Sequence, residues 1–211
     1  MDSLDVRRSS VLDGLKQLCR LFWGPDLDQC QEIFQGKYFS PFEALKAQLD
    51  DAPVDALQKI DAIVGRFTDR DALCNYLEED FVRLFISHKG GIVAPLYQSC
   101  YEFENAPLMG ASATMMTERF ESKGLSVADN LHEPPDHLSV EMEYLYFLLE
   151  KGWSDGGDDT LAEEAVSFAS ENMLPWIQQF ALRLNEKRGP SFYFFAASVL
   201  CGLLQFIAKS E

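Results

Sequence analysis

The sequence predicts an all-α fold, a single globular multi-helix domain that covers residues 1–211. Apolar residues recur with the helical period along almost the whole chain, which is typical of amphipathic helices. Proline and glycine interrupt this pattern and mark where helices begin and end. No convincing alternation of apolar and polar residues predicts a β-strand. A chain of 211 residues can bury one substantial core, and we expect nine or ten helices around it.

The first half of the chain divides at proline and glycine. A first helix has Leu12, Leu15, Leu18 and Phe22 on its apolar face and ends at Gly24-Pro25, and a short second helix covers residues 26–34. The stretch "SPFEAL" predicts a helix start, with Ser40 as the cap, Pro41 at the first position and Glu43 three residues after the cap. Two longer helices are expected to follow, over residues 54–67 and 69–86.

The second half begins after a glycine-containing loop, "SHKGGIVAP", at residues 87–95. A helix over residues 113–123 is expected to end at Gly124, and another runs from residue 138 to 149. The stretch "KGWSDGGDDT" predicts a Gly/Asp-rich linker at residues 151–159. Residues 160–186 then form one helix or a pair kinked around Pro175, and the last helix covers residues 192–208.

Two segments resemble export or membrane signals without satisfying the requirements of either. Arg7 and Arg8 form an arginine pair near the N-terminus, but charged residues interrupt the apolar stretch that an export signal needs there. Residues 192–208 contain no charge, yet 17 residues are marginal for crossing about 30 Å of hydrocarbon. We therefore expect a first amphipathic helix and a buried last helix, with no stable insertion into a membrane.

The chain is strongly acidic. It has 18 basic and 34 acidic residues and a net charge of -16. This charge repels phosphate backbones and anionic lipid, so nucleic acid is not expected as a partner, whereas a basic peptide is attracted.

Five cysteines, an odd number, lie far apart and form no CxxC pair: Cys19, Cys30, Cys74, Cys100 and Cys201. This spacing favours reduced, mostly buried thiols of a cytoplasmic protein over a disulfide framework or a zinc site.

The segment "HEPPDH" at residues 132–137 has several interpretations. Its potential ligands suggest a metal site, but the two histidines are five residues apart and two prolines prevent one helix from carrying both. An Asp136-His137 pair is also compatible with a metal- or nucleotide-dependent hydrolase. In the simplest interpretation, Asp136 caps the following helix and His137 lies in its first turn.

Several stretches occur in the order found in one protein family. "LEEDFVRLFI", "APLYQSCY", "LMG", "KGL" and "PPDHLSVEMEYL" together resemble the TorD/DmsD/NarJ family of redox-enzyme maturation chaperones. The resemblance covers roughly residues 10–208, and its most specific part is Asp136, His137 and Glu141. The sequence departs from the usual family pattern at Pro134 and Asn130.

The resemblance implies a TorD-like fold and a cytoplasmic chaperone without enzymatic activity or a cofactor. Its expected partners are the twin-arginine signal peptide and the apo catalytic subunit of a molybdenum-containing oxidoreductase, which it holds for cofactor insertion before export. Carboxylates would bind the arginines and an apolar groove the rest of the signal peptide. A homodimer that exchanges helices through the 151–159 linker is left open. The expected signal-peptide-binding residues are Asp136, His137, Glu141, Leu84, Phe85, Pro95, Tyr97, Ser99 and Tyr101.

Overall fold

The computed structural model describes residues 3–87, 91–127, 132–188 and 190–209. Within these ranges the fold is all-α, as the sequence predicts, and it contains nine α-helices and no strand. Their bounds are α1 Ser3–Trp23, α2 Leu27–Phe34, α3 Asp51–Val64, α4 Arg70–Phe81, α5 Ala111–Ser122, α6 Leu138–Trp153, α7 Asp159–Ser167, α8 Leu174–Arg188 and α9 Phe192–Ala208.

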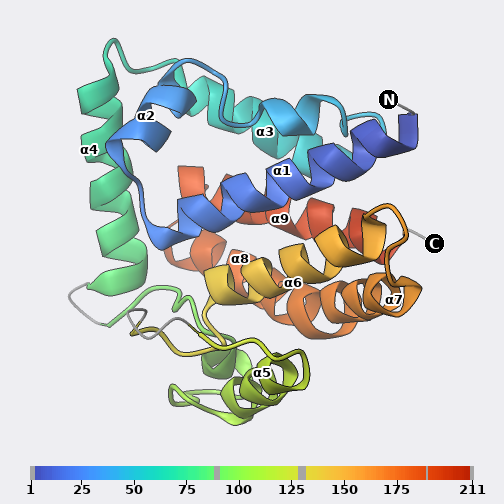
Figure 1. The fold of residues 1–211 in the computed structure, drawn as a ribbon. Coiled ribbons are helices and arrows are strands. Elements are labelled where there is room, and N and C mark those ends of the chain that lie inside the picture. Colours follow the sequence, from blue (N-terminus) through green and yellow to red (C-terminus); the bar gives the residue numbers. More distant parts are fainter. Residues whose placement is uncertain (1–2, 88–90, 128–131, 189, 210–211) are drawn as a thin grey trace.

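Helix α9 lies at the centre of the molecule. It packs against α3 on one side and α8 on the other, while α1 packs along α6 (Figure 1). Gly202 permits the close approach of α3, because a Cβ atom at this position would lie 2.5 Å from Cγ of Pro53. The predicted buried last helix is confirmed: its apolar side chains fill the core. No helix in the described part of the chain combines the length and apolar character needed to span a bilayer.

Helix α4 joins this core through an aromatic cluster at its C-terminal end. A π-helical turn, Val82–Ile86, continues the helix and turns Phe85 inward. The ring of Phe85 lies 5.0 Å from Phe81, 5.2 Å from Tyr193 and 5.9 Å from Phe180, centroid to centroid. Edge-to-face and offset contacts of this kind stabilise aromatic pairs beyond their burial.

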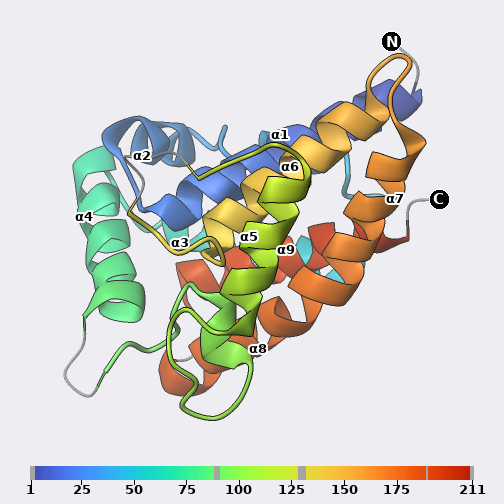
Figure 2. The same ribbon diagram turned by 60° about the horizontal axis from the view of Figure 1, so that its bottom comes forward.

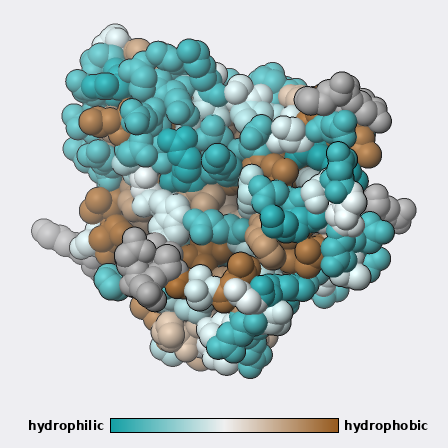
Figure 3. Space-filling view, in the orientation of Figure 1, coloured by the Kyte–Doolittle hydropathy of each residue, from teal (hydrophilic) through white to brown (hydrophobic). Residues whose placement is uncertain are grey.

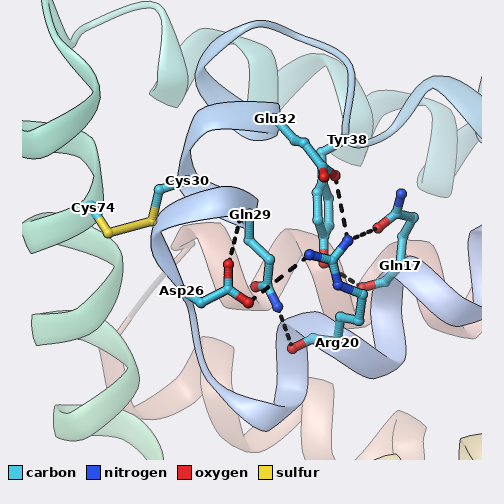
Figure 4. A network of polar contacts seen from close by, with 8 residues as sticks. All are labelled: Gln17, Arg20, Asp26, Gln29, Cys30, Glu32, Tyr38 and Cys74. Atoms are coloured by element: carbon cyan, nitrogen blue, oxygen red, sulfur yellow. Dashed lines mark hydrogen bonds and ion pairs between the residues drawn. A yellow bond between two sulfur atoms is a disulfide. The ribbon is translucent and has the colours of Figure 1, made fainter.

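Helix α2 is fastened to α1 by polar contacts around Arg20 (Figure 4). The guanidinium group of Arg20 lies 3.5 Å from Glu32 and 4.0 Å from Asp26. Asp26 also caps α2 by accepting a hydrogen bond from the amide of Gln29, at 2.7 Å. The hydroxyl of Tyr38 donates to the carbonyl of Gln17 at 2.6 Å, so the chain after α2 is fixed to α1 as well.

The prediction that all five cysteines are reduced is wrong for one pair. Cys30 of α2 and Cys74 of α4 form a disulfide between two positions 44 residues apart, and both side chains are buried (Figure 4). Sequence spacing could not reveal this pair, because only the side-by-side packing of α2 and α4 brings the two residues together. Cys19, Cys100 and Cys201 are free thiols.

The predicted helix start at Ser40 differs from the structure. "SPFEAL" begins only a 3-10 turn, Ser40–Glu43, and no side chain caps it, so the predicted cap at Ser40 is wrong. The amide of Phe42, which a cap at Ser40 would bond, instead donates to the carbonyl of Phe39 at 3.1 Å.

The predicted linker is much shorter than residues 151–159. Helix α6 extends to Trp153 and α7 begins at Asp159, so only residues 154–158 lie between them. Gly157 lies so close to the end of α6 that a Cβ atom there would be 2.5 Å from the carbonyl oxygen of Gly152. The chain does not break near Pro175, because a π-helical turn, Phe168–Met173, joins α7 to α8 just before it. A wider turn of this kind suits a residue that has no backbone N–H to donate.

Reduction of the Cys30–Cys74 disulfide should lower the free energy of unfolding by about 2–4 kcal/mol, because the bond restricts the unfolded chain. Denaturant unfolding of the oxidised protein with and without a reductant measures this difference. The variant Cys30→Ala/Cys74→Ala should not respond to the reductant. Alkylation of both cysteines in denatured protein that was never reduced would contradict the disulfide.

Candidate functional site

The candidate site forms where two loop segments cross in front of α6. Residues 134–137 make a turn closed by the amide of His137, which donates to the carbonyl of Pro134 at 3.0 Å. This turn pairs with the segment at residues 96–98: Leu138 donates to the carbonyl of Leu96 at 2.8 Å, and Gln98 to the carbonyl of Asp136 at 3.0 Å. The prolines thus place the signature residues beside the segment "APLYQSCY". Asn130, the other departure from the family pattern, lies outside the described residues.

Asp136 is completely buried and does not cap α6, so that prediction is wrong. Its Oδ2 atom accepts hydrogen bonds from the amide of Ser99, at 2.8 Å, and from the hydroxyl of Ser112, at 3.3 Å. The cap is His137, one residue later, whose Nδ1 atom accepts from the amide of Ser139 at 3.1 Å. Asp136 instead joins a short 3-10 helix, Gln98–Tyr101, to the start of α5.

His137 lies between two aromatic rings. The indole of Trp23 is stacked on it with centroids 4.6 Å apart, and the ring of Tyr97 meets it edge-on at 5.2 Å. Burial disfavours the charged imidazolium and lowers the pKa of His137 to about 4. Since Nδ1 accepts a hydrogen bond, the neutral ring has its proton on Nε2.

Glu141 is completely buried one turn into α6. Its Oε2 atom accepts a hydrogen bond from the indole of Trp176 on α8, at 3.0 Å. Burial raises the pKa of Glu141 well above its usual range, and the nearby charge of Asp136 raises it further. Three buried oxygen atoms here, Oε1 of Glu141, Oδ1 of Asp136 and Oγ of Ser99, have no hydrogen-bond partner among the described residues.

Helix α5 is held at both ends. At its start, Glu102 accepts hydrogen bonds from the amide and the hydroxyl of Ser112, at 2.7 and 2.8 Å. At its end, Lys123 forms an ion pair of 2.6 Å with Glu164 of α7, and Arg119 lies 3.7 Å from the same carboxylate. Figure 2 shows α5 brought forward, standing at the edge of the bundle. The contacts of Asp136 and Glu102 thus determine where α5 begins.

The structure brings most of the predicted site residues together, but most of their side chains are buried. Tyr101 is buried, its hydroxyl donates to the carbonyl of Pro95 at 2.8 Å, and Arg183 lies 4.3 Å from its ring centroid. Leu84 and Phe85 belong to the hydrophobic core and do not line an open groove. Of the nine predicted residues, only Pro95 and Tyr97 are partly exposed. A role of these residues in peptide binding remains a prediction.

Three accessible residues beside the signature were not predicted to bind a peptide. Glu133 accepts a hydrogen bond from the hydroxyl of Tyr97 at 2.7 Å, and Glu143 accepts one from the indole of Trp23 at 3.3 Å. Trp23 and Glu133 are partly exposed, and Glu143 is exposed. We call Trp23, Tyr97, Glu133 and Glu143, which surround His137, the His137 surface. Helical periodicity could have placed Glu143 on the outer face of α6. No local pattern predicts that Trp23 contacts His137, which lies 114 positions later in the chain.

Replacing Glu141 with glutamine should stabilise the protein relative to the wild type as the pH rises above about 4.5. The folded state holds a proton on Glu141 that the unfolded state loses above about pH 4.5, so stability falls as the pH rises, by at most about 1.4 kcal/mol per pH unit. His137 acts in the opposite direction, because its lowered pKa removes stability as the pH falls from 6.5 to about 4.

Thermal unfolding of both proteins at a series of pH values above 4.5 isolates the contribution of Glu141, because they share the contribution of His137. The wild type should lose stability with rising pH relative to Glu141→Gln, in which the side chain does not titrate and still accepts the Trp176 hydrogen bond. Equal slopes for the two proteins would contradict a protonated Glu141 in the fold.

Comparison with known proteins supports the resemblance read from the sequence. A family model described as the nitrate reductase delta subunit matches residues 44–182. The chaperone protein TorD of Vibrio cholerae serotype O1 (strain O395) is 30% identical over 145 residues, which cover 67% of this chain and 65% of that protein. TorD of Vibrio parahaemolyticus is 29% identical over 161 residues, which cover 75% of this chain and 71% of that protein. The matched region is thus slightly less than two thirds of the Vibrio cholerae protein.

The fold is also similar to that of a solved structure. A crystal structure of a redox enzyme maturation protein from Archaeoglobus fulgidus superimposes with a TM-score of 0.54 and 24% sequence identity, covering 94% of this chain and 93% of that one. This similarity shows a shared fold. Because the family model matches well over half of the sequence, the chain belongs to the TorD/NarJ family, whose model is described as the nitrate reductase delta subunit.

Proposed function

We propose that the protein is a cytoplasmic chaperone, without enzymatic activity, for a molybdenum-containing oxidoreductase. It binds the twin-arginine signal peptide and the apo catalytic subunit and holds them until the cofactor is inserted and export begins. Membership of the TorD/NarJ family supports the general role. The observation that carries the peptide-binding part is the His137 surface, where two carboxylates and two aromatic rings remain accessible around the family signature.

This surface suits a pair of guanidinium groups. Glu133 accepts one hydrogen bond, on Oε2, and Glu143 accepts two, both on Oε1, from the indole of Trp23 and the thiol of Cys19. All three donors are neutral, and each carboxylate has a second oxygen for an arginine. The ring of Trp23 offers a face on which a planar guanidinium group can stack. His137 does not repel the arginines, because burial keeps it neutral at pH 7.

Asp136 and Glu141 have a different role in this proposal from the one expected from sequence. Both are completely buried, and burial raises the pKa of Glu141 well above its usual range. They hold the surrounding segments in place, while Glu133 and Glu143 make the contacts with the peptide. The net charge of -16 assists the first encounter with a basic signal region.

The hydrolase alternative requires Asp136 to orient His137 as a base. The hydrogen bonds do not follow that arrangement, since Asp136 accepts from Ser99 and Ser112 whereas Nδ1 of His137 accepts from the amide of Ser139. An orienting carboxylate would instead accept the imidazole N–H. This geometry favours the chaperone over the enzyme.

The variant Glu143→Gln should bind a twin-arginine signal peptide roughly tenfold more weakly, because one charge-assisted hydrogen bond is lost. The loss should be largest at low salt, where screening is weakest. A twin-lysine peptide should bind the wild type less tightly, since an ammonium group cannot form the paired contacts of a guanidinium group. Calorimetric titration of both peptides at low and high salt measures these differences.

Glu150→Gln provides the matched control, because Glu150 is exposed on the same helix and its replacement changes the net charge equally. It should leave peptide affinity unchanged. Equal affinities of the wild type, Glu143→Gln and Glu133→Gln at low salt would remove the His137 surface from the proposal. Absence of any binding to the wild type would refute signal-peptide recognition itself.

A further inference from the structure

The segment between Tyr101 and α5 forms a compact loop whose two ends are fixed together. Glu102 bonds to Ser112 through both the amide and the hydroxyl, and Gly110 lies so close that a Cβ atom there would be 2.7 Å from the Glu102 carboxylate. A loop with closed ends that stands out from the surface is often a functional element. We call residues 103–109 the closed loop.

The closed loop exposes large apolar side chains. Phe103 is 60% exposed, Leu108 51% and Met109 63%, and Met115 on the adjacent first turns of α5 is 44% exposed. Asn105 and Met109 have positive φ angles of 59° and 63°, a region that non-glycine residues seldom occupy. A strained backbone that presents an apolar side chain to solvent points to binding, because folding alone does not favour either feature.

The charges around this surface define its partner. Residues 91–118 contain three glutamates, Glu102, Glu104 and Glu118, and no lysine, arginine or histidine. The nearby cations are engaged elsewhere: Arg183 lies against the ring of Tyr101, and Arg119 pairs with Glu164. An apolar segment that also carries positive charge is therefore complementary to this surface, whereas an acidic or anionic partner is repelled.

We propose that the closed loop and Met115 bind the apolar stretch that follows the arginine pair of the signal peptide; this inference rests on the proposed function and adds a second contact surface to it. The two surfaces are physically linked, since Asp136 accepts hydrogen bonds from both Ser99 and Ser112. Methionine thioethers adapt to different side chains, so this surface accepts apolar stretches of varied sequence. Figure 3 shows that apolar side chains also form a band across the middle and lower left of one face, below a hydrophilic upper part.

The test compares two synthetic peptides, both with the arginine pair. One continues into an apolar stretch, and in the other glycine and serine replace that stretch. The variant Leu108→Ser/Met109→Ser should bind the first peptide roughly tenfold more weakly than the wild type does, and the second peptide equally well. The control Leu4→Ser/Leu27→Ser removes two similarly exposed side chains from α1 and α2 and should bind both peptides as the wild type does.

Oxidation of methionine by hydrogen peroxide, followed by mass spectrometry, gives an independent readout. The apolar peptide should protect Met109 and Met115, while the buried Met142 and Met173 resist oxidation with or without peptide. If the wild type binds the apolar peptide but the loop variant binds it equally and neither methionine is protected, the closed loop is not the contact and the proposed function stands. If the wild type binds neither peptide, both proposals fail.

A third outcome would assign the surface to a second copy of the chain. Protection of Met109 and Met115 that rises with protein concentration in the absence of peptide would show a contact between copies, provided that the protection of Met115 disappears in Leu108→Ser/Met109→Ser. That result would overturn the proposed peptide contact.

Discussion

The carboxylate of Asp136 joins parts of the chain that are far apart in sequence. It accepts hydrogen bonds from Ser99, in the segment after α4, and from Ser112, at the start of α5, while its own backbone leads into α6. A carboxylate placed inside a protein is favourable only when such donors compensate for the water that it loses. The positions of the closed loop, of the segment at residues 96–101 and of the His137 surface all depend on this one group.

Burial divides the signature residues into two roles. Asp136 and Glu141 lie inside, where they fix neighbouring segments through Ser99, Ser112 and Trp176, and burial raises the pKa of Glu141. His137 lies just beneath the surface, neutral and enclosed by Trp23 and Tyr97. In the proposed function, a site for arginines needs exposed carboxylates and no competing cation, and Glu133 and Glu143 would supply the charge. The buried residues would then support recognition without touching the peptide.

Sequence periodicity was sufficient to predict the helices, because each helix buries a stripe that a 3.6-residue period reveals. The family resemblance also assigned Pro95, Tyr97, Ser99 and Tyr101 to the same expected site as Asp136. The sequence could not predict features that depend on contacts between residues far apart in the chain. The Cys30–Cys74 disulfide and the stacking of Trp23 on His137 arise from helix packing and leave no local pattern. Leu84 and Phe85 were predicted to line a groove, but an apolar residue of the core and one of a groove have the same pattern in sequence.

Hydrogen–deuterium exchange at the amide of Ser99 tests the central claim most directly, because this N–H donates to Oδ2 of Asp136 at 2.8 Å. In the wild type, the amide should exchange slowly although it lies in the first turn of a four-residue 3-10 helix, Gln98–Tyr101. In Asp136→Asn, which replaces the carboxyl acceptor with a weaker amide acceptor, exchange there should accelerate while α2 and α3 remain unchanged. Fast exchange at Ser99 in the wild type, or an unchanged rate in Asp136→Asn, would contradict the account.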